Sequence, residues 1–332
     1  MNVKLFALLS GALFCLTAPL TVAANNHAAH PVIALADNDI NAGSRNDAEP
    51  RLNALSVLVL NQDSGQTLYQ KNSGVETPIA SITKLMTAMV ILDAHLPMEE
   101  TLTISALDVD KLRHTGSRLP VGTELTRGEL LHLALIASEN RAAHALARTY
   151  PGGRERFIYA MNNKARNLAM QHTAFEDPTG LSSNNRSTAE DLAKLVEAAS
   201  HYPQIRDITT TSSYEISHPA LVRVNSKHKK QWRHVVRRVE FRNTNRLVRD
   251  NNWNIGLSKT GFINEAGHCL VMQTKIAQQR VIIVLLDAYG KYARLADAQH
   301  IKTWLEHRVT DNPVAALNAA GTLRQPSVYV QN

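Results

Sequence analysis

Ser81 and Lys84 lie three residues apart at the start of an apolar run with helical spacing, in TPIASITKLMTAMVILD (residues 77–93). On a helix, residues three apart share a face, with Cβ atoms about 5–6 Å apart. A serine hydroxyl becomes an effective nucleophile when a base takes its proton, and a lysine with a lowered pKa can be that base. The pair therefore fits either a nucleophile with its base or a helix cap beside an unrelated lysine. The same spacing recurs at Ser226 and Lys229, so spacing alone does not decide.

A second lysine motif lies near the end of the chain, where LSKTGF places Lys259, Thr260 and Gly261 in an extended segment. A lysine here can bind a substrate carboxylate, and its charge can lower the pKa of Lys84 by repulsion. Gly261 has no side chain, so a peptide can lie against the strand edge and pair with its backbone. On its own, the tripeptide also fits an ordinary strand end.

Ser138 and Asn140 form a third candidate pair in ASENR, at a predicted turn between two helices. Such a turn can point a hydroxyl and an amide toward the start of the helix in the first motif. The pattern of serine, any residue and asparagine recurs at Ser44, Ser182 and Ser183. Context favours Ser138, because Ser44 lies in a polar lead-in and the other two lie in a turn-rich segment.

The order and spacing of the three motifs are more specific than any one of them, and together they are typical of acyl-serine enzymes that bind penicillin. From about Leu55 to Arg308 the sequence resembles the low-molecular-mass penicillin-binding proteins of the D-alanyl-D-alanine carboxypeptidase/endopeptidase family. The resemblance extends to the segments PIASITKLMTA, SRLPVGTELTRGELLHLALIAS, NRAAHALA, MNNKARNLAM and TAFEDPTGLSS. It implies a β-lactamase/transpeptidase-like fold.

The resemblance also implies a role for each residue of the first and third motifs. Ser81 would attack the carbonyl of a D-alanyl peptide bond and become acylated, with Lys84 as the general base. Ser138 would relay the proton to the leaving amine, while Asn140 would orient Lys84 and hydrogen-bond the substrate amide. The sequence departs from the family pattern at Glu139, where relatives often have a small residue. Its side chain is expected to point away from the site, and it could alter rate or substrate choice.

For the second motif, the resemblance implies that Lys259 and Thr260 hold the carboxylate side of the substrate and support proton transfer. Gly261 and Phe262 complete this substrate-binding segment, and the backbone N–H groups of Ser81 and Phe262 would form the oxyanion hole. Water would then hydrolyse the acyl-enzyme, whereas β-lactams would mimic the substrate and leave slowly. No metal site and no cofactor are predicted, because the 14 histidines are scattered without a convincing ligand set.

The expected reaction within the family depends on the length of chain after the last predicted helix. Carboxypeptidases of the family usually carry a second, β-rich domain and a C-terminal amphipathic helix. The 24 residues after Arg308 are too few for such a domain and lack a basic amphipathic face. This favours an endopeptidase that hydrolyses cross-links between peptidoglycan stem peptides. Three alternatives are a DD-carboxypeptidase that removes terminal D-alanine, a β-lactamase, and a non-catalytic penicillin sensor. A Glu-bearing loop of the kind that class A β-lactamases use is not evident.

The surrounding pattern predicts an α+β fold, an antiparallel sheet flanked by helices with a mainly helical subdomain. Residues 55–72 form a strand hairpin, and apolar residues at helical spacing over about 126–170 indicate a helical middle. The segment 187–200 begins with a capping sequence from Ser187 to Glu190. Three strands come next in NIGLSKTGF, GHCLVMQTKI and RVIIVLLDA, and a helix over 291–308 closes the pattern. Strands far apart in the sequence must therefore pair around the helical middle.

The N-terminus predicts export. Lys4, an apolar run and the small residues up to Ala24 form a secretory signal peptide with cleavage near Ala23 or Ala24. The expected boundaries are a signal peptide over 1–24, a flexible lead-in over 25–50, a DD-peptidase domain over 51–308 with its helical subdomain at about 95–200, and a loose tail over 309–332. The mature chain keeps only Cys269, so it forms no internal disulfide and no transmembrane anchor is expected. Together these features predict a periplasmic protein.

The net charge of +7 is concentrated in one segment, because residues 223–249 hold ten Lys or Arg residues against a single acid, Glu240. Such a patch can attract polyanions through its summed field. In an exported protein, a carboxylate-bearing polymer is a better partner than nucleic acid. Weak peripheral association with the wall or the membrane is therefore one interpretation. The other is a solvated hairpin whose charges prevent edge-to-edge aggregation.

Overall fold

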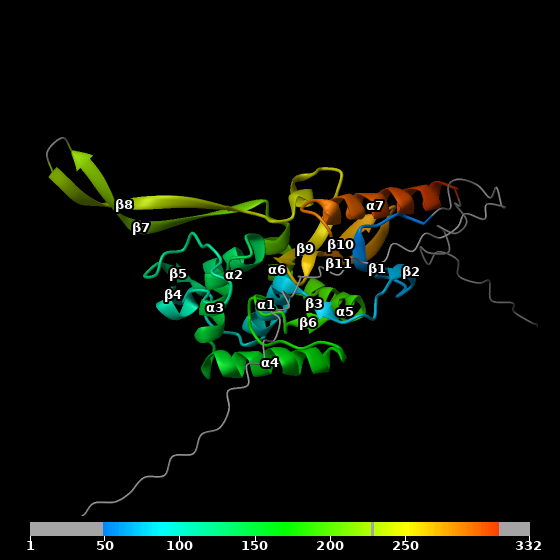
Figure 1. The fold of residues 1–332 in the computed structure, drawn as a ribbon, viewed down its shortest axis with the longest axis horizontal. Helices are drawn as coiled ribbons and strands as arrows, with labels where there is room; N and C mark the ends of the chain where they lie inside the picture. Colours follow the sequence, from blue (N-terminus) through cyan, green and yellow to red (C-terminus); the bar gives the residue numbers. More distant parts are fainter. Residues whose placement is uncertain (1–48, 227–228, 312–332) are drawn as a thin grey trace, which may run out of the picture. The chain divides into compact units, whose positions relative to one another are not determined.

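A five-stranded antiparallel sheet is central to the part of the chain that the structure describes, residues 49–226 and 229–311 (Figure 1). In this computed structural model the strand order is β2-β1-β11-β10-β9. The strands are β1 (Ala54–Asn61), β2 (Thr67–Lys71), β9 (Asn254–Ile263), β10 (Gly267–Ile276) and β11 (Gln279–Ala288). Because β1 pairs with β11, the first and last strands close the sheet around everything that lies between them in the sequence.

Both faces of this sheet are covered, which explains why β11 reads as a continuous apolar run rather than an alternating one. Within 281–286, the odd-numbered side chains form a cluster with Ile301 and Trp304 of α7 (Ala293–Asp311). The even-numbered side chains belong to a larger cluster that includes Leu192 and Leu195 of α5 (Ala189–Ser200). Successive strand residues point to opposite faces, so the two clusters result directly from the pleat.

The helical part packs around α1 (Thr83–Asp93), whose residues 83–91 are all buried. A helix that is buried on every side must be surrounded by other elements, and α1 contacts the five helices α2 to α6. These neighbours are α2 (Arg127–Ile136), α3 (Asn140–Arg148), α4 (Gly153–Asn167), α5 and α6 (Pro203–Thr210). Because α5 also packs on β1, β10 and β11, it connects the central helix to the sheet.

Three 3-10 turns and three separate strand pairs complete the described part of the chain. Three 3-10 turns are η1 (Ala80–Ile82), η2 (Ala106–Asp108) and η3 (Arg246–Arg249). Three two-stranded sheets pair β3 (Thr77–Pro78) with β6 (Arg186–Ser187), β4 (Thr101–Thr103) with β5 (Glu124–Thr126), and β7 (Ser213–Ser226) with β8 (Lys229–Arg242). The basic segment, residues 223–249, therefore contributes the end of β7, all of β8, and η3. Ser226 and Lys229 are cross-strand partners in the β7–β8 hairpin, not residues of a helix.

The predicted fold class, an α+β protein with an antiparallel sheet flanked by helices, is confirmed. Two predictions of local structure were wrong. The first concerned the cap of α5: Thr188, with extended φ and ψ of −108° and 163°, accepts a hydrogen bond from Asp191 N, whereas Ser187 pairs in β6. The second concerned Ser81, which lies in η1. Helix α1 begins two residues later, and its N-cap position, Ile82, makes no side-chain capping bond.

The predicted signal peptide, nearly all of the lead-in and most of the C-terminal tail lie outside the described residues. Helix α7 ends at Asp311, three residues beyond the predicted end of the closing helix. Within 49–226 and 229–311, no helix combines the length and the apolar character needed to cross a membrane.

Candidate active site

Ser81 occupies a tight turn, and the backbone around it is unusual. Ala80, a fully buried residue, has a φ of +47°, in the left-handed region that residues with a Cβ rarely adopt. The turn is held from within, since Thr83 Oγ1 donates a hydrogen bond of 2.8 Å to Ala80 O. It is also held from outside, because Ile79 N donates to Asn185 O at 3.0 Å. Left-handed residues cluster at functional sites, where packing maintains the strain.

Two glycines allow other segments to approach the Ser81 turn closely. Gly180 has a φ of +82°, and a Cβ there would lie 1.8 Å from Ala80 O, which no neighbour could accommodate. A Cβ on Gly261 would lie 2.9 Å from Ile79 O and 3.1 Å from Ser81 N. The glycine of the Lys-Thr-Gly motif therefore brings the β9 backbone directly beside the nitrogen of Ser81.

Lys84 connects Ser81 to the third motif. Its Nζ lies 2.9 Å from Ser81 Oγ and donates hydrogen bonds to Asn140 Oδ1 and to the carbonyl of Thr179, each at 2.8 Å. The side chain is completely buried. Because the amide and carbonyl oxygens only accept, a neutral amine uses its two protons on them and keeps its lone pair for the Ser81 hydroxyl. This is the arrangement that a base needs.

Burial lowers the pKa of Lys84 to about 7, against the partial opposition of Asp177 and Glu139, whose negative charges raise it. The sequence had suggested instead that repulsion from Lys259 makes Lys84 neutral. Desolvation is the dominant cause, because an ammonium removed from water is disfavoured whatever its neighbours. The repulsion is felt at the other lysine: burial first, then the charges of Lys84 and Arg294, hold the pKa of Lys259 well below its ordinary value.

Ser138 and Lys259 come together from the helical part and from the sheet. Lys259 Nζ donates to Ser138 Oγ at 3.0 Å and to Thr260 O at 2.9 Å, and its side chain is 1% exposed. Ser138 has a φ of +59°, which turns the chain sharply between α2 and α3. Glu139 then begins α3, where its side chain accepts from Arg141 N at 3.2 Å. The unusual middle residue of the motif therefore acts as a helix cap.

The structure thus brings the three sequence motifs together, with Thr260 buried and Phe262 exposed beside them. Thr260 Oγ1 donates to Thr244 Oγ1 at 2.6 Å. Phe262 is 52% exposed and its ring stacks on His268, with centroids 4.3 Å apart. Behind them, Arg294 of α7 donates to Gly261 O at 2.9 Å and fixes the β9 backbone from the far side.

Several residues at the site carry no motif that sequence reasoning used. The segment 177–185 was interpreted as turn-rich and, up to Ser183, as part of the family resemblance, but no role in the site was predicted for it. Its Thr179 carbonyl accepts from Lys84. Asp177 shapes this segment, because its carboxylate accepts from the backbone nitrogens of Gly180 at 2.8 Å and Ser182 at 2.7 Å. Asn185 Nδ2 donates to Thr83 Oγ1 at 3.0 Å and connects the segment to α1. A signal was available in DPTG, since Asp with Gly three residues later is typical of a turn.

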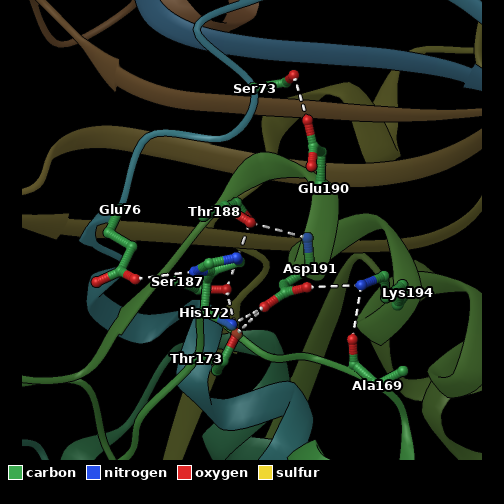
Figure 2. Close-up of polar contacts among 10 residues, drawn as sticks. All are labelled: Ser73, Glu76, Ala169, His172, Thr173, Ser187, Thr188, Glu190, Asp191 and Lys194. Atoms are coloured by element: carbon green, nitrogen blue, oxygen red, sulfur yellow. Dashed lines mark hydrogen bonds and ion pairs between the residues drawn. The ribbon is translucent and has the colours of Figure 1, made fainter.

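A second polar network anchors the same segment at the start of α5 (Figure 2). Asp191, 1% exposed, accepts from His172 N at 2.8 Å, Thr173 Oγ1 at 2.9 Å and Lys194 Nζ at 2.8 Å. Its neighbour Glu190 accepts from Ser73 Oγ at 2.8 Å (Figure 2). The network ties the two ends of 172–188 to one helix.

The cysteine and the histidines, the other residue types considered for chemistry, have contacts typical of structural residues. Cys269 is fully buried, and burial raises the pKa of its thiol to about 11, so it is a small core residue rather than a reactive thiolate. His132 Nδ1 donates a hydrogen bond to Gly128 O at 2.8 Å, and its ring stacks on Tyr214. In the described part of the chain, no group of three or more His, Cys, Asp or Glu residues is placed to bind a metal ion.

Comparisons with known proteins assign the chain to a family. Residues 43–290 match the family model for D-alanyl-D-alanine carboxypeptidase. The chain belongs to this family. It is 47% identical over 262 residues to a D-alanyl-D-alanine endopeptidase of Pseudomonas aeruginosa, covering 79% of this chain and 80% of the relative. It is 42% identical over 280 residues to a D-alanyl-D-alanine endopeptidase of Escherichia coli, covering 83% and 85%.

A solved structure extends the likeness to the fold. The chain is similar to penicillin-binding protein D2 from Listeria monocytogenes in its cefotaxime-bound form, with a TM-score of 0.63 and 27% identity. The match covers 77% of this chain and 98% of that one. The family inferred from three short motifs is therefore confirmed, and so is the penicillin-binding fold that the resemblance implied.

Proposed function

We propose that this chain is a serine DD-endopeptidase that hydrolyses D-alanyl cross-links between peptidoglycan stem peptides. The observation that carries the proposal is the contact between Lys84 Nζ and Ser81 Oγ at 2.9 Å, made by a fully buried lysine. Burial lowers the pKa of this lysine to about 7. A general base works best when its pKa is near the working pH, and an ordinary lysine would be almost fully charged there.

In the first step, Lys84 Nζ takes the hydroxyl proton while Ser81 Oγ bonds to the carbonyl carbon of the D-alanyl peptide. The negative charge that develops on the carbonyl oxygen is stabilised by the N–H groups of Ser81 and Phe262. The contact distances at Gly261 support this assignment, because they bring the two backbone segments together. Preorganised donors of this kind typically contribute a few kcal/mol to the barrier.

In the second step, the carbon–nitrogen bond breaks, and the proton held by Lys84 passes through Ser138 to the leaving amine. Ser138 is hydrogen-bonded to Lys259 at 3.0 Å. The acyl group remains on Ser81 as an ester. Water then adds to the ester, Lys84 again accepts a proton, and Ser81 Oγ leaves with it. Lys259 and Thr260 hold the carboxylate side of the substrate, which lies along β9, a strand that pairs with β10 alone among the described strands.

Endopeptidase activity is proposed over carboxypeptidase activity because two relatives at 47% and 42% identity bear that name. The family model, by contrast, bears the name of the carboxypeptidase. Purified protein is to be incubated in parallel with a cross-linked muropeptide dimer and with a pentapeptide monomer. We expect monomers from the dimer to appear first. Faster release of D-alanine from the pentapeptide would assign a carboxypeptidase instead, and cleavage of neither substrate would reject the proposal.

The same serine explains the proposed sensitivity to β-lactams. A β-lactam presents a strained amide and a carboxylate in the arrangement of the D-alanyl peptide, so Ser81 opens the ring and keeps the acyl group. The similarity to a protein solved in a cefotaxime-bound form supports this partner. Release over minutes or longer, rather than milliseconds, separates this function from that of a β-lactamase.

The proposed place of action is the periplasm, with residues 1–24 removed as a signal peptide and 25–50 left as a lead-in to the DD-peptidase domain of 51–308. This proposal rests on the sequence pattern of the N-terminus and on a substrate found only outside the cytoplasm. The tail over 309–332 is proposed to lie outside that domain.

The basic hairpin, formed by β7 (Ser213–Ser226) and β8 (Lys229–Arg242), is proposed to hold the enzyme on its anionic substrate. Its base packs on the helical part, since Tyr214 stacks on His132 and the guanidinium of Arg118 lies 3.9 Å from the centroid of the Phe241 ring. Arg237 and Arg238 lie on β8, farther from this base than Phe241, and both are exposed. Exposed guanidinium groups are suited to carboxylates on a polymer, which stem peptides carry.

Replacing Arg237, Arg238 and Arg242 with glutamine is expected to weaken binding to isolated sacculi by roughly threefold to tenfold at low salt. The difference should disappear as salt rises, because exposed charges are screened. The matched control replaces three arginines of α4, Arg154, Arg156 and Arg166. Equal loss in both triple variants, or unchanged binding in the hairpin variant, would contradict a docking role and leave the solvated-hairpin interpretation.

A further inference from the structure

Thr115 lies between Asn140 and a buried carboxylate. Its Oγ1 donates to Asp110 Oδ2 at 2.7 Å and accepts from Asn140 Nδ2 at 3.0 Å. Asp110 is 6% exposed and also accepts from the backbone nitrogens of Leu112, Arg113 and Thr115 at 2.8, 3.0 and 2.9 Å. These bonds close the turn over 110–115 and place the threonine hydroxyl against the amide of Asn140.

Counting donors and acceptors fixes the direction of each bond. Burial alone would raise the pKa of Asp110, but the hydrogen bonds that it accepts from Thr115, Arg113 and Leu112 hold the pKa at about 2. The carboxylate is therefore ionised and only accepts, so the single proton of the Thr115 hydroxyl points to it. Thr115 is left able only to accept from the next group. The NH₂ end of the Asn140 amide must then face Thr115.

The orientation of Asn140 matters because its other end meets Lys84. With Nδ2 on Thr115, Oδ1 faces Lys84 Nζ at 2.8 Å and accepts one of its protons. If the amide were rotated by half a turn, its NH₂ group would face Lys84 instead. That donor would compete with the Ser81 hydroxyl for the lone pair of neutral Lys84, and the nucleophile would lose its base.

We propose that Thr115 and Asp110 are positioning residues that fix the amide of Asn140 and so direct the lone pair of Lys84 to Ser81. The proposal deepens the proposed function and rests on it, because it concerns the activation of Ser81. It extends the site by one partly buried chain of hydrogen bonds, from Asp110 through Thr115 and Asn140 to Lys84. A polar chain of this kind is useful only when every member is satisfied.

The charged groups around Lys84 come from three other segments. Asp177 lies in the turn after α4 and Glu139 at the start of α3, and both raise the pKa of Lys84. Lys259 of β9 and His144 of α3 are the remaining titratable groups coupled to it, and the charge of Lys84 lowers the pKa of each. Substitutions at Thr115 leave all four in place, so a change in pH dependence reports on the hydrogen-bond chain.

The test compares Thr115→Val, Thr115→Ser and Thr173→Val in the full protein, with acylation by a fluorescent penicillin as the measured rate. Valine keeps the shape of threonine but neither donates nor accepts, and we expect acylation to slow by about tenfold to hundredfold. Serine keeps the hydroxyl and should acylate at close to the wild-type rate. Thr173 makes an equivalent bond to the buried Asp191 (Figure 2), so Thr173→Val controls for the loss of a threonine–aspartate bond away from Ser81.

The pH profile separates positioning from a general loss of structure. In Thr115→Val the ammonium form of Lys84 loses a fixed acceptor, so its pKa should fall and the acid limb of the acylation profile should move to lower pH. The plateau should also fall, because the lone pair is diverted. A uniform decrease at every pH with an unmoved limb, or equal losses in Thr115→Val and Thr173→Val, would overturn the proposal. So would wild-type acylation in Thr115→Val.

If Thr115→Val has a folding defect, its melting temperature will be lower than that of the wild-type protein. In that case Thr115→Ala is used in its place and is compared with Thr115→Ser in the same way. The assay is independent of the natural substrate. If the wild-type protein cleaves no muropeptide yet is acylated, the proposed function fails while the role of Thr115 is still decided by the acylation rates.

Discussion

Replacing Ser81 with alanine is expected to abolish covalent penicillin labelling and to lower kcat/KM for cross-linked muropeptide by about 10⁴-fold or more. The reason is that no other hydroxyl in the described part of the chain combines the contact with Lys84, at 2.9 Å, and the approach of the β9 backbone at Gly261. Ser138 is another hydroxyl of the site, but its hydrogen-bond partner is Lys259. Labelling is measured by gel fluorescence, and cleavage by separation of the muropeptides.

The matched control for this prediction is Ser73→Ala. Ser73 is also a largely buried serine, 7% exposed, and it donates to Glu190 at the start of α5 rather than to a catalytic group (Figure 2). Losing that bond should cost about 1 kcal/mol of stability and leave labelling intact. Penicillin labelling or muropeptide cleavage that survives in Ser81→Ala would refute the assignment of the nucleophile.

The second large effect is expected at Lys84. Because burial lowers its pKa to about 7, the neutral fraction falls about tenfold for each pH unit below that value. The acylation rate should therefore rise with pH up to about pH 7 and then reach a plateau. Lys84→Met, which keeps the length of the side chain without an amine, should slow acylation by about 10²–10⁴-fold and remove this acid limb.

Lys194→Met is the control, because Lys194 bonds Asp191 in the α5 network and contacts no residue of the candidate active site. Its pH profile should match that of the wild-type protein. An acid limb that stays near the ordinary lysine value, well above pH 9, would show that Lys84 is charged at neutral pH. Rapid acylation by Lys84→Met at pH 7 would exclude it as the base.

The motifs could be predicted from the sequence because each is local. The three-residue spacing of Ser81 and Lys84 places both side chains on one side of a helical turn, and Gly261 lies two residues after Lys259 on one strand. Their assembly could be inferred from the order of the motifs, together with a sheet closed by β1 and β11. The reason for the lowered pKa of Lys84 could not be predicted, because complete burial depends on packing among segments far apart in the sequence.

Other parts of the site could not be predicted because they use backbone groups or act through a second residue. The Thr179 carbonyl is a backbone group, which every residue type carries, so its contact with Lys84 has no signature. Thr115 and Asp110 act through Asn140, and only the fold places the turn over 110–115 against α3. The sequence also allowed Ser81 to be a helix cap. It could not predict the strained turn at Ala80, because that turn depends on the close approach of Gly180, which is far away in the sequence.

The most direct test of Ser81 as the nucleophile is to trap the acyl-enzyme formed from a cross-linked muropeptide dimer. Rapid quenching in acid, with proteolysis and mass spectrometry afterwards, locates the donor acyl group on the chain. We predict a mass increase on the peptide that contains Ser81, equal to the donor stem up to its D-alanyl carbonyl and absent in Ser81→Ala. An increase on another peptide, or efficient cleavage with no covalent intermediate on Ser81, would contradict the proposed mechanism.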